Sequence, residues 1–179
     1  MVITLIGYRG SGKSTVAVPL AERLGWDWAD ADVEIERRAG KSIREIFTET
    51  GESAFRRDEA DVLKDLLGKD KLVIAAGGGA ILNPDTCTRM RNAGLVVWLK
   101  ASIETLAERI LADPTTVDRR PNLTQSGGWE EIETLLAERE PLYLACAHRV
   151  LPVDGQTPED LARTIAGWAA SWGGEEPAE

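Results

Sequence analysis

The sequence is poor in cysteine, histidine and basic residues. It has 179 residues with two cysteines, one histidine and 21 Lys and Arg against 30 Asp and Glu, so its net charge is −9. Cys87 and Cys146 have no Cys or His partners at metal-ligand spacing, which argues against a zinc site or a disulfide framework. Both are expected to be small buried hydrophobic residues in a reducing cytoplasm. Because basic residues are in deficit, we expect no binding to nucleic acid or to anionic lipid.

Long hydrophobic runs are also missing. No apolar run approaches the roughly 20 residues that cross a bilayer, and the N-terminal run meets a Gly-rich turn too early to be a signal peptide. One core suffices at this length, since single cores serve roughly 100 to 200 residues. The sequence therefore predicts one cytoplasmic domain over 1–172, monomeric because nothing marks an apolar interface. Residues 173–179 form a small acidic tail that is expected to fray.

The chain does contain short apolar runs that alternate with longer amphipathic stretches, which is typical of a parallel sheet covered by helices. The expected fold class is therefore α/β. Helix starts are marked by Asn83 before Pro84, by Ser102, and by Thr157 before Pro158, because each pairs a cap residue with a suitable first turn. The expected strands cover 2–6, 26–29, 72–75, 95–99 and 149–153.

Two segments stand outside this alternation. Apolar residues at helical spacing between 45 and 67 are interrupted near Gly51, and we interpret them as part of an inserted helical arm over about 31–67. Residues 112–128 carry several prolines and glycines and few large apolar residues. Since they are too long for an ordinary connection, they are expected to be either a functional lid or a disordered loop.

The strongest motif is Gly-Tyr-Arg-Gly-Ser-Gly-Lys-Ser at 7–14, which matches the phosphate-loop pattern Gly-x-x-x-x-Gly-Lys-Ser/Thr between a strand and a helix. Glycine lets backbone N–H groups converge on a phosphate, and the helix N-terminus adds partial positive charge. Lys13 should bridge the β- and γ-phosphates, and Ser14 should ligate Mg²⁺. An ordinary Gly-rich turn explains the glycines but not the added Lys-Ser. The residues expected to hold phosphate oxygens are Gly10, Ser11, Gly12, Lys13, Ser14 and Thr15.

The loop alone does not separate kinases from GTPases or ATP-driven machines. A GTPase is disfavoured, because the sequence has no Asn-Lys-x-Asp motif and no Asp-x-x-Gly switch after the third expected strand. Further motifs follow in order, and their spacing together resembles that of shikimate kinases over nearly the whole chain. These motifs are Asp-Ala-Asp at 30–32, Gly-Lys-Ser at 40–42, Phe-Arg-Arg at 55–57, three glycines at 77–79, Arg-Pro at 120–121 and Arg-Glu-Pro-Leu-Tyr at 139–143.

The resemblance implies a fold and an activity. It implies a five-stranded parallel sheet of order 2-3-1-4-5, and ATP-dependent phosphorylation of shikimate at its 3-hydroxyl, a step of aromatic amino-acid biosynthesis. It places Asp32 at the accepting hydroxyl, where a carboxylate can orient the nucleophile and accept its proton. It places Asp30 near Mg²⁺, which prefers carboxylate oxygen. Alternatively, both aspartates only end a strand and cap the next helix.

The same resemblance assigns the groups that bind the acceptor. Arg56 and Arg139 match positions that grip the substrate carboxylate, a task that suits the planar guanidinium fork. Glu59 either orients Arg56 or faces solvent, and the role of Arg57 is left open. The glycines expected to let the backbone approach the substrate, or else to form only a tight turn, are Gly77, Gly78 and Gly79.

On the nucleotide side, Arg109 resembles the arginine that stacks on adenine, and Pro158 a residue that closes the adenine pocket. Arg120 matches the lid arginine of the family, with Arg119 as the neighbouring candidate, and would bring a cation to the developing charge. The lid departs from the family pattern, because Arg-Pro is followed by Asn-Leu instead of Leu-Leu and the run from 109 to 120 is longer.

Two other functions stay open. The chain could phosphorylate another small hydroxylated acid such as gluconate, since arginines can select a carboxylate but not the ring that bears it. It could also be a non-catalytic nucleotide-sensing module, which predicts that acceptor-side residues are missing. His148 is expected to be structural, because Asp32 already serves as proton acceptor. Trp98 is expected in the core, and Trp168 and Trp172 are expected to pack together on the sheet face.

Overall fold

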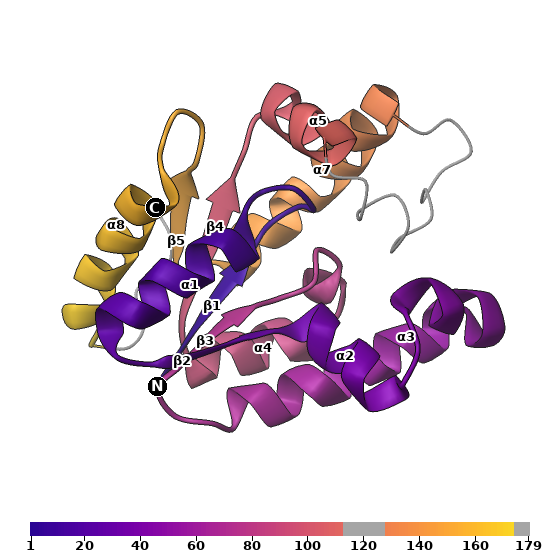
Figure 1. Cartoon of the computed structure of the whole chain (residues 1–179), viewed down its shortest axis with the longest axis horizontal. Coiled ribbons are helices and arrows are strands. Elements are labelled where there is room, and N and C mark those ends of the chain that lie inside the picture. The colour runs from indigo at the N-terminus through magenta and orange to yellow at the C-terminus, as the bar shows by residue number, and fades with distance from the viewer. Residues whose placement is uncertain (113–127, 174–179) are drawn as a thin grey trace.

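A computed structural model of the chain describes residues 1–112 and 128–173 (Figure 1). In this described part, five parallel strands form one sheet in the order β2-β3-β1-β4-β5, which confirms the expected topology. The central strand pairs on both sides, with Ile3 opposite Val73 on one neighbour and Leu95 on the other. The strands are β1 (Val2–Ile6), β2 (Asp27–Asp30), β3 (Leu72–Ala75), β4 (Gly94–Lys100) and β5 (Arg149–Pro152).

All five strands lie where the sequence predicts them, with ends that differ by at most one residue. Trp26 is the residue lost from β2, because its N–H donates to Ala21 O in the turn after the first helix. The helical elements are α1 (Lys13–Leu24), α2 (Ala31–Ala39), α3 (Ile43–Leu67), the 3₁₀ turn η1 (Ala80–Leu82), α4 (Pro84–Ala93), α5 (Ile103–Ala112), α7 (Gly128–Cys146) and α8 (Pro158–Ala170).

Helices cover both faces of the sheet, so the fold has three layers (Figure 1). Successive residues of β1 point to opposite faces, as strand geometry requires. Ile3 and Leu5 pack in the cluster with α1 and α8, whereas Val2 and Ile6 pack in the cluster with α3, α4 and the end of α7. Trp98 is buried in this second cluster, as expected. No helix in 1–112 or 128–173 is long and apolar enough to span a membrane.

The three helix starts read from the sequence are confirmed. Asn83 Oδ1 accepts hydrogen bonds from the backbone N–H groups of Asp85 and Thr86, at 2.9 and 3.2 Å. The Ser102 and Thr157 hydroxyls each accept from the backbone N–H three residues further on, at 3.2 Å. Each bond satisfies a donor that the first helical turn would otherwise leave unpaired.

The predicted helical arm corresponds to α2 and α3. The predicted interruption is at Gly51, whose φ of 79° and ψ of 171° break the helical path of α3. A residue with a Cβ is strained at that φ, so glycine suits the kink. That this arm binds substrate stays a prediction. The predicted lid at 112–128 lies almost wholly outside the described residues, as does nearly all of the acidic tail at 173–179.

The two cysteines lie together in the fold although they are far apart in the sequence. Cys146 is buried as expected, but Cys87 is only half-buried. A hydrogen bond between the thiols lowers the pKa of Cys87 and raises that of Cys146. Both are free cysteines in this structure.

His148 has the structural role that was expected. It precedes β5, at the end of the sheet opposite the strand carboxyl ends, and its Nδ1 accepts from Val96 N–H at 3.1 Å. Its ring packs on Trp172 with centroids 4.7 Å apart. Trp172 lies beyond the end of α8 and not on it. Both Trp172 and Trp168 pack against the core cluster that contains Ile3 and Leu5. Burial, with smaller contributions from Arg91 and Arg149, lowers the pKa of His148 to about 4.

This buried imidazole makes stability depend on pH. The unfolded chain takes up a proton near pH 6.5, whereas the folded chain does so only near pH 4, as the lowered His148 pKa requires. The free energy of unfolding should therefore fall by up to about 3 kcal/mol as pH falls from 6.5 to 4. His148→Asn keeps an acceptor for Val96 N–H but cannot titrate. Urea melts across this range should show a shallower pH dependence for the variant; equal slopes would contradict the assignment.

Candidate active site

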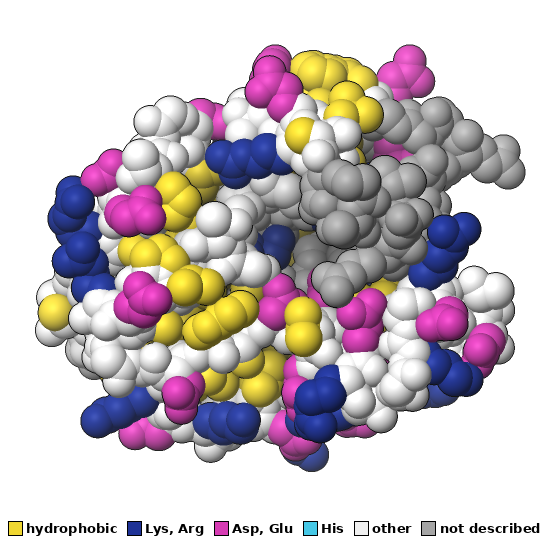
Figure 2. Space-filling model, viewed as in Figure 1, with side chains coloured by type: hydrophobic (Ala, Val, Ile, Leu, Met, Phe, Trp, Pro, Cys, Tyr) yellow, Lys and Arg dark blue, Asp and Glu magenta, His cyan; other side chains and the backbone are white. Residues whose placement is uncertain are grey.

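The phosphate loop lies at the carboxyl edge of the sheet, where open α/β sheets bind their ligands. A cavity of about 590 Å³ opens there between the loop, the end of β2 and the turn before α8. Figure 2 shows the hollow, with a basic side chain deep inside it and acidic side chains on its lower rim. The cavity is lined by all the residues predicted to hold phosphate, namely Gly10, Ser11, Gly12, Lys13, Ser14 and Thr15.

Glycine is required at the start of this loop. A Cβ on Gly7 would lie 2.7 Å from Leu99 O and 2.8 Å from Ser11 Oγ, so any side chain would force the loop off the sheet. Gly12 caps α1 in the left-handed region at φ 91° and has no side chain to cover the helix N-terminus. The first N–H groups of α1 therefore face the cavity, where they can bind an anion.

The ammonium group of Lys13 is held in the mouth of the loop. Its Nζ donates to Gly7 O and Tyr8 O at 2.9 Å each, and it lies 3.5 Å from Ser11 Oγ. These contacts keep the positive charge of Lys13 within the phosphate loop, next to the N-terminus of α1. Phosphate oxygens that enter the loop would thus meet a cation that is already in position.

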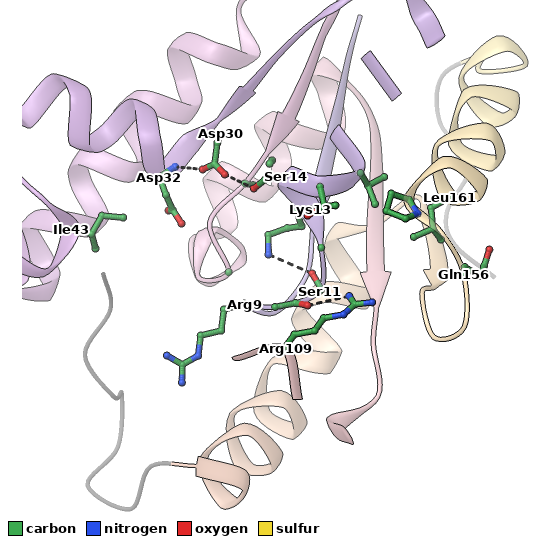
Figure 3. Close-up of a pocket in the computed structure, with 18 of the residues that line it drawn as sticks. Arg9, Ser11, Lys13, Ser14, Asp30, Asp32, Ile43, Arg109, Gln156 and Leu161 are labelled. Atoms are coloured by element: carbon green, nitrogen blue, oxygen red, sulfur yellow. Dashed lines mark hydrogen bonds between the residues drawn. The ribbon is translucent and has the colours of Figure 1, made fainter. Parts of the chain in front are cut away.

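Asp30 caps α2 and also contacts the residue predicted to ligate Mg²⁺. Its Oδ1 caps α2 by accepting from the N–H groups of Asp32 and Val33, at 2.9 and 3.4 Å. Its other oxygen, Oδ2, accepts a hydrogen bond from the Ser14 hydroxyl (Figure 3). A hydroxyl and a carboxylate that meet at the cavity wall are hard oxygen donors and fit a divalent cation. No cluster of three or more His, Cys, Asp or Glu that could hold a metal ion occurs in the described ranges.

Asp32 lies in the first turn of α2, opposite Lys13. It lines the same cavity, and Figure 3 shows its carboxylate pointing into the open space beside the Lys13 ammonium. The α2 start thus presents one aspartate to Ser14 and the other to the cavity. The alternative that both aspartates only cap a helix does not account for the direction of Asp32.

Arg56 is fixed by two carboxylates of its own helix. Its Nη1 donates to Glu59 Oε2 at 2.6 Å, while Nη2 and Nε lie 3.3 and 3.4 Å from Glu52 Oε1. Glu59 is only 3% exposed, so the structure favours its orienting role over a solvent-facing one. A Cβ on Gly79 would lie 2.3 Å from Arg56 Nη1, so this glycine lets the guanidinium lie flat against the loop at 77–79.

The second arginine predicted to bind the acceptor, Arg139, lies on α7. The Arg139 guanidinium carbon is 5.8 Å from the centroid of the Tyr8 ring, a cation–π contact. Four residues on, the Tyr143 hydroxyl donates to Gly78 O at 2.7 Å, and its ring stacks on Trp98. The sequence motif at 139–143 contains this tyrosine, but only the fold reveals that it anchors the glycine loop.

Arg109 and Pro158 line the cavity at its other end. Arg109 Nη1 donates to Gly10 O at 3.3 Å, which holds the guanidinium across the phosphate loop (Figure 3). Their position fits the nucleotide side predicted for them. Arg119 and Arg120 lie outside the described residues, so the choice between them stays a prediction. Arg9 occupies an unspecified position of the loop pattern, so the sequence leaves its role open, and it also lines the cavity.

The arrangement is that of a phosphoryl-transfer site, and comparison with known proteins identifies its kind. The family model for shikimate kinase matches residues 9–169. The chain belongs to the shikimate kinase family. As a member, it is an ATP-dependent phosphotransferase with an alcohol acceptor.

Similar proteins cover most of its length. The shikimate kinase of Nitratidesulfovibrio vulgaris is 39% identical over 92% of this chain and 95% of its own. That of Chlorobium chlorochromatii is 42% identical over 92% of this chain and 90% of its own. The structure of the Acinetobacter baumannii shikimate kinase in complex with shikimate matches with a TM-score of 0.88 at 36% identity, covering 95% of this chain and 93% of its own.

Proposed function

We propose that this chain transfers the γ-phosphoryl group of ATP to the 3-hydroxyl of shikimate, giving shikimate 3-phosphate and ADP for aromatic amino-acid biosynthesis. The observation that carries the proposal is the placement of Asp32 and Lys13 on opposite sides of one cavity. Two arginines suited to a carboxylate, Arg56 and Arg139, lie against Gly79 and over the ring of Tyr8. A non-catalytic nucleotide sensor would need the phosphate loop but not the residues predicted to bind the acceptor. These residues, Asp32, Arg56 and Arg139, are all present.

Positioning and charge stabilisation supply the chemistry. Asp32 orients the acceptor hydroxyl for in-line attack and accepts its proton as the new O–P bond forms. Lys13 and the loop N–H groups stabilise the charge on the transferred phosphoryl and on the leaving ADP oxygen. We keep Arg120 as the residue that would bring a further cation to this charge, a role that rests on the family resemblance alone.

Mg²⁺ is the cation that we propose for the pair Ser14 and Asp30. Held by these two residues together with ATP, it would neutralise negative charge on the phosphates. Ser14 and Asp30 are hydrogen-bonded to each other at the cavity wall, so the ligand oxygens lie together. The capping of α2 by the same carboxylate keeps Asp30 from turning away.

The acceptor is selected through its carboxylate. Arg56, on α3, lies against Gly79 and is held by Glu59, whereas Arg139, on α7, lies over the ring of Tyr8. Fixed guanidinium groups lose little freedom on binding, so they favour a planar carboxylate at one defined place. The fold of a Sinorhizobium meliloti gluconokinase is similar with a TM-score of 0.56 at 17% identity, which is a likeness of fold alone.

Product analysis tests this function. Incubation with ATP and Mg²⁺ plus shikimate or gluconate, followed by mass spectrometry and ³¹P NMR, should show one phosphate ester, on the 3-oxygen of shikimate. Phosphorylation of gluconate at an equal rate would favour the second candidate function.

We also infer that the protein works as a monomer in the cytoplasm. Light scattering should therefore give the mass of one chain, 19.5 kDa. A mass twice as large would contradict the inference of a monomer.

Gly79→Ala should weaken acceptor binding without affecting the nucleotide. Because the new Cβ would lie 2.3 Å from Arg56 Nη1, the guanidinium must leave the place where Glu59 holds it. We expect KM for shikimate to rise by about tenfold, the value of one displaced charge-assisted hydrogen bond, while KM for ATP stays constant. Gly167→Ala, in open space on α8, is the matched control. Unchanged KM for shikimate in Gly79→Ala would show that the loop does not position Arg56.

A further inference from the structure

Arg9 is a cavity residue that the phosphate-loop pattern does not explain. The pattern leaves its position free, and its backbone alone would complete the loop. Its side chain nevertheless lines the cavity together with Asp32 and Ile43. Figure 3 shows it extending away from Arg109, toward the side where Asp32 and Ile43 lie. Arg9 is thus on the acceptor side of the cavity, whereas Arg109 is on the nucleotide side.

A buried carboxylate holds Arg9 in this position. Arg9 Nη2 lies 3.3 Å from Oε1 of Glu131, in the first turn of α7. The Glu131 side chain is 0% exposed and that of Arg9 is 13% exposed, so the pair is largely shielded from water. A buried carboxylate is costly unless charged or hydrogen-bonding partners surround it, which ties the two groups to each other. The guanidinium is therefore fixed before any ligand arrives.

This fixed guanidinium retains capacity to bind an anion. A guanidinium carries five N–H donors, and the buried Nε–H of Arg9 has no acceptor among the described residues. Arg139 lies over the ring of the neighbouring residue, Tyr8, at 5.8 Å. Arg9 and Arg139 both lower the pKa of Tyr8, although burial outweighs them and raises it overall. Both positive charges therefore lie near the side chain of Tyr8.

The position of Arg9 favours the acceptor's carboxylate over the nucleotide's phosphates. The phosphate loop already offers Lys13 and the N-terminus of α1 to phosphate. In Arg56, by contrast, the guanidinium already donates hydrogen bonds to Glu59 through Nη1 and to Glu52 through Nη2. Neither Arg56 nor Arg139 is among the described residues that line the cavity. Arg9, as a further cation on the acceptor side, would supply additional hydrogen-bond donors to a carboxylate.

We propose that Arg9 is a third arginine that binds the carboxylate of the acceptor, and that Glu131 is the residue that positions it. This inference rests on the proposed function, because it assigns a residue to the binding of shikimate. Two variants and their combination separate binding from structure. Arg9→Met removes the donors and keeps the length of the side chain, and Glu131→Gln removes the buried charge and keeps its shape.

Each variant has its own expected result. Arg9→Met should raise KM for shikimate by about tenfold to a hundredfold, the value of a lost charge-assisted pair, with KM for ATP within about twofold. It should also lower Tm, because Glu131 is left buried without its arginine. Glu131→Gln should raise KM for shikimate less, since Arg9 remains but is held less firmly. The double variant should recover Tm while KM for shikimate stays as high as in Arg9→Met.

The double variant decides between the two roles. If KM for shikimate recovers together with Tm, the pair is structural and the proposal is wrong. If KM for ATP rises instead, Arg9 serves the phosphates and the proposal is equally wrong. Shikimate methyl ester gives a further check, because wild type and Arg9→Met should use it almost equally. Arg23→Met, at an exposed position in the last turn of α1, controls for the loss of one positive charge.

Failure of the proposed function would look different. In that case the wild type itself would show no shikimate-dependent release of ADP, and the role of Arg9 would fall with it. A wild type that is active, together with an Arg9→Met variant whose KM for shikimate is normal, would overturn the inference about Arg9 alone.

Discussion

Replacement of Asp32 by asparagine is expected to lower kcat by about a thousandfold, within the range measured for the loss of a general base. The amide keeps the size of the side chain but cannot accept the proton of the attacking hydroxyl. Asp32 Oδ1 is buried at the wall of the cavity, so a bulk-water substitute is poorly placed to take over. Steady-state kinetics with saturating ATP and shikimate measures the change.

Nucleotide binding should survive this substitution, because the phosphate loop and Ser14 contribute separate groups to the cavity. Titration calorimetry with Mg·ATP should therefore give the same Kd for wild type and Asp32→Asn. Asp27→Asn makes the same chemical change at an exposed position of β2, remote from the cavity edge, and should leave kcat unchanged. Turnover at the wild-type rate in Asp32→Asn would remove this residue from the mechanism.

Lys13→Met is expected to have the second largest effect, at least a hundredfold in kcat, as for other groups that stabilise developing charge. The ammonium group donates to Gly7 O and Tyr8 O, so its loss also unties the two ends of the loop. KM for ATP should accordingly rise with the fall in kcat, in contrast to Asp32→Asn. Steady-state kinetics over a range of ATP concentrations separates the effect on kcat from the effect on KM for ATP.

Lys69→Met provides the control for this change. Lys69 is exposed after the end of α3, and its substitution removes the same charge without touching the cavity. We expect wild-type kinetics for this variant. If Lys13→Met lowered Tm but left kcat and KM for ATP intact, the lysine would serve only to hold the loop together.

The sheet and the phosphate loop could be predicted because their signals are local. Strand β1 is a short apolar run followed directly by glycines, and Lys13 begins a helix whose N-terminus has to face the loop. Cap residues such as Asn83 mark helix starts through a hydrogen bond to residues two or three positions away. Signals of this kind do not depend on which distant segment packs against them.

Contacts between distant segments could not be predicted in this way. Glu131 reaches Arg9 across 122 positions, and Tyr143 reaches Gly78 across 65. Their pairing follows from where α7 packs against α5, η1 and β4, which hydrophobic periodicity alone does not specify. The family resemblance pointed to single residues and suggested Glu59 as a partner of Arg56. The partners of Arg9 and Gly78 became visible only in the fold.

The steady-state release of ADP with shikimate as acceptor tests the central claim most directly. A coupled assay with Mg·ATP should show release that requires shikimate, saturates with its concentration, and yields one shikimate 3-phosphate for each ADP. The rate without shikimate should be lower by several orders of magnitude, because water would not be held against Asp32 as we propose for the acceptor hydroxyl. Binding of ATP with no shikimate-dependent release of ADP would contradict the account.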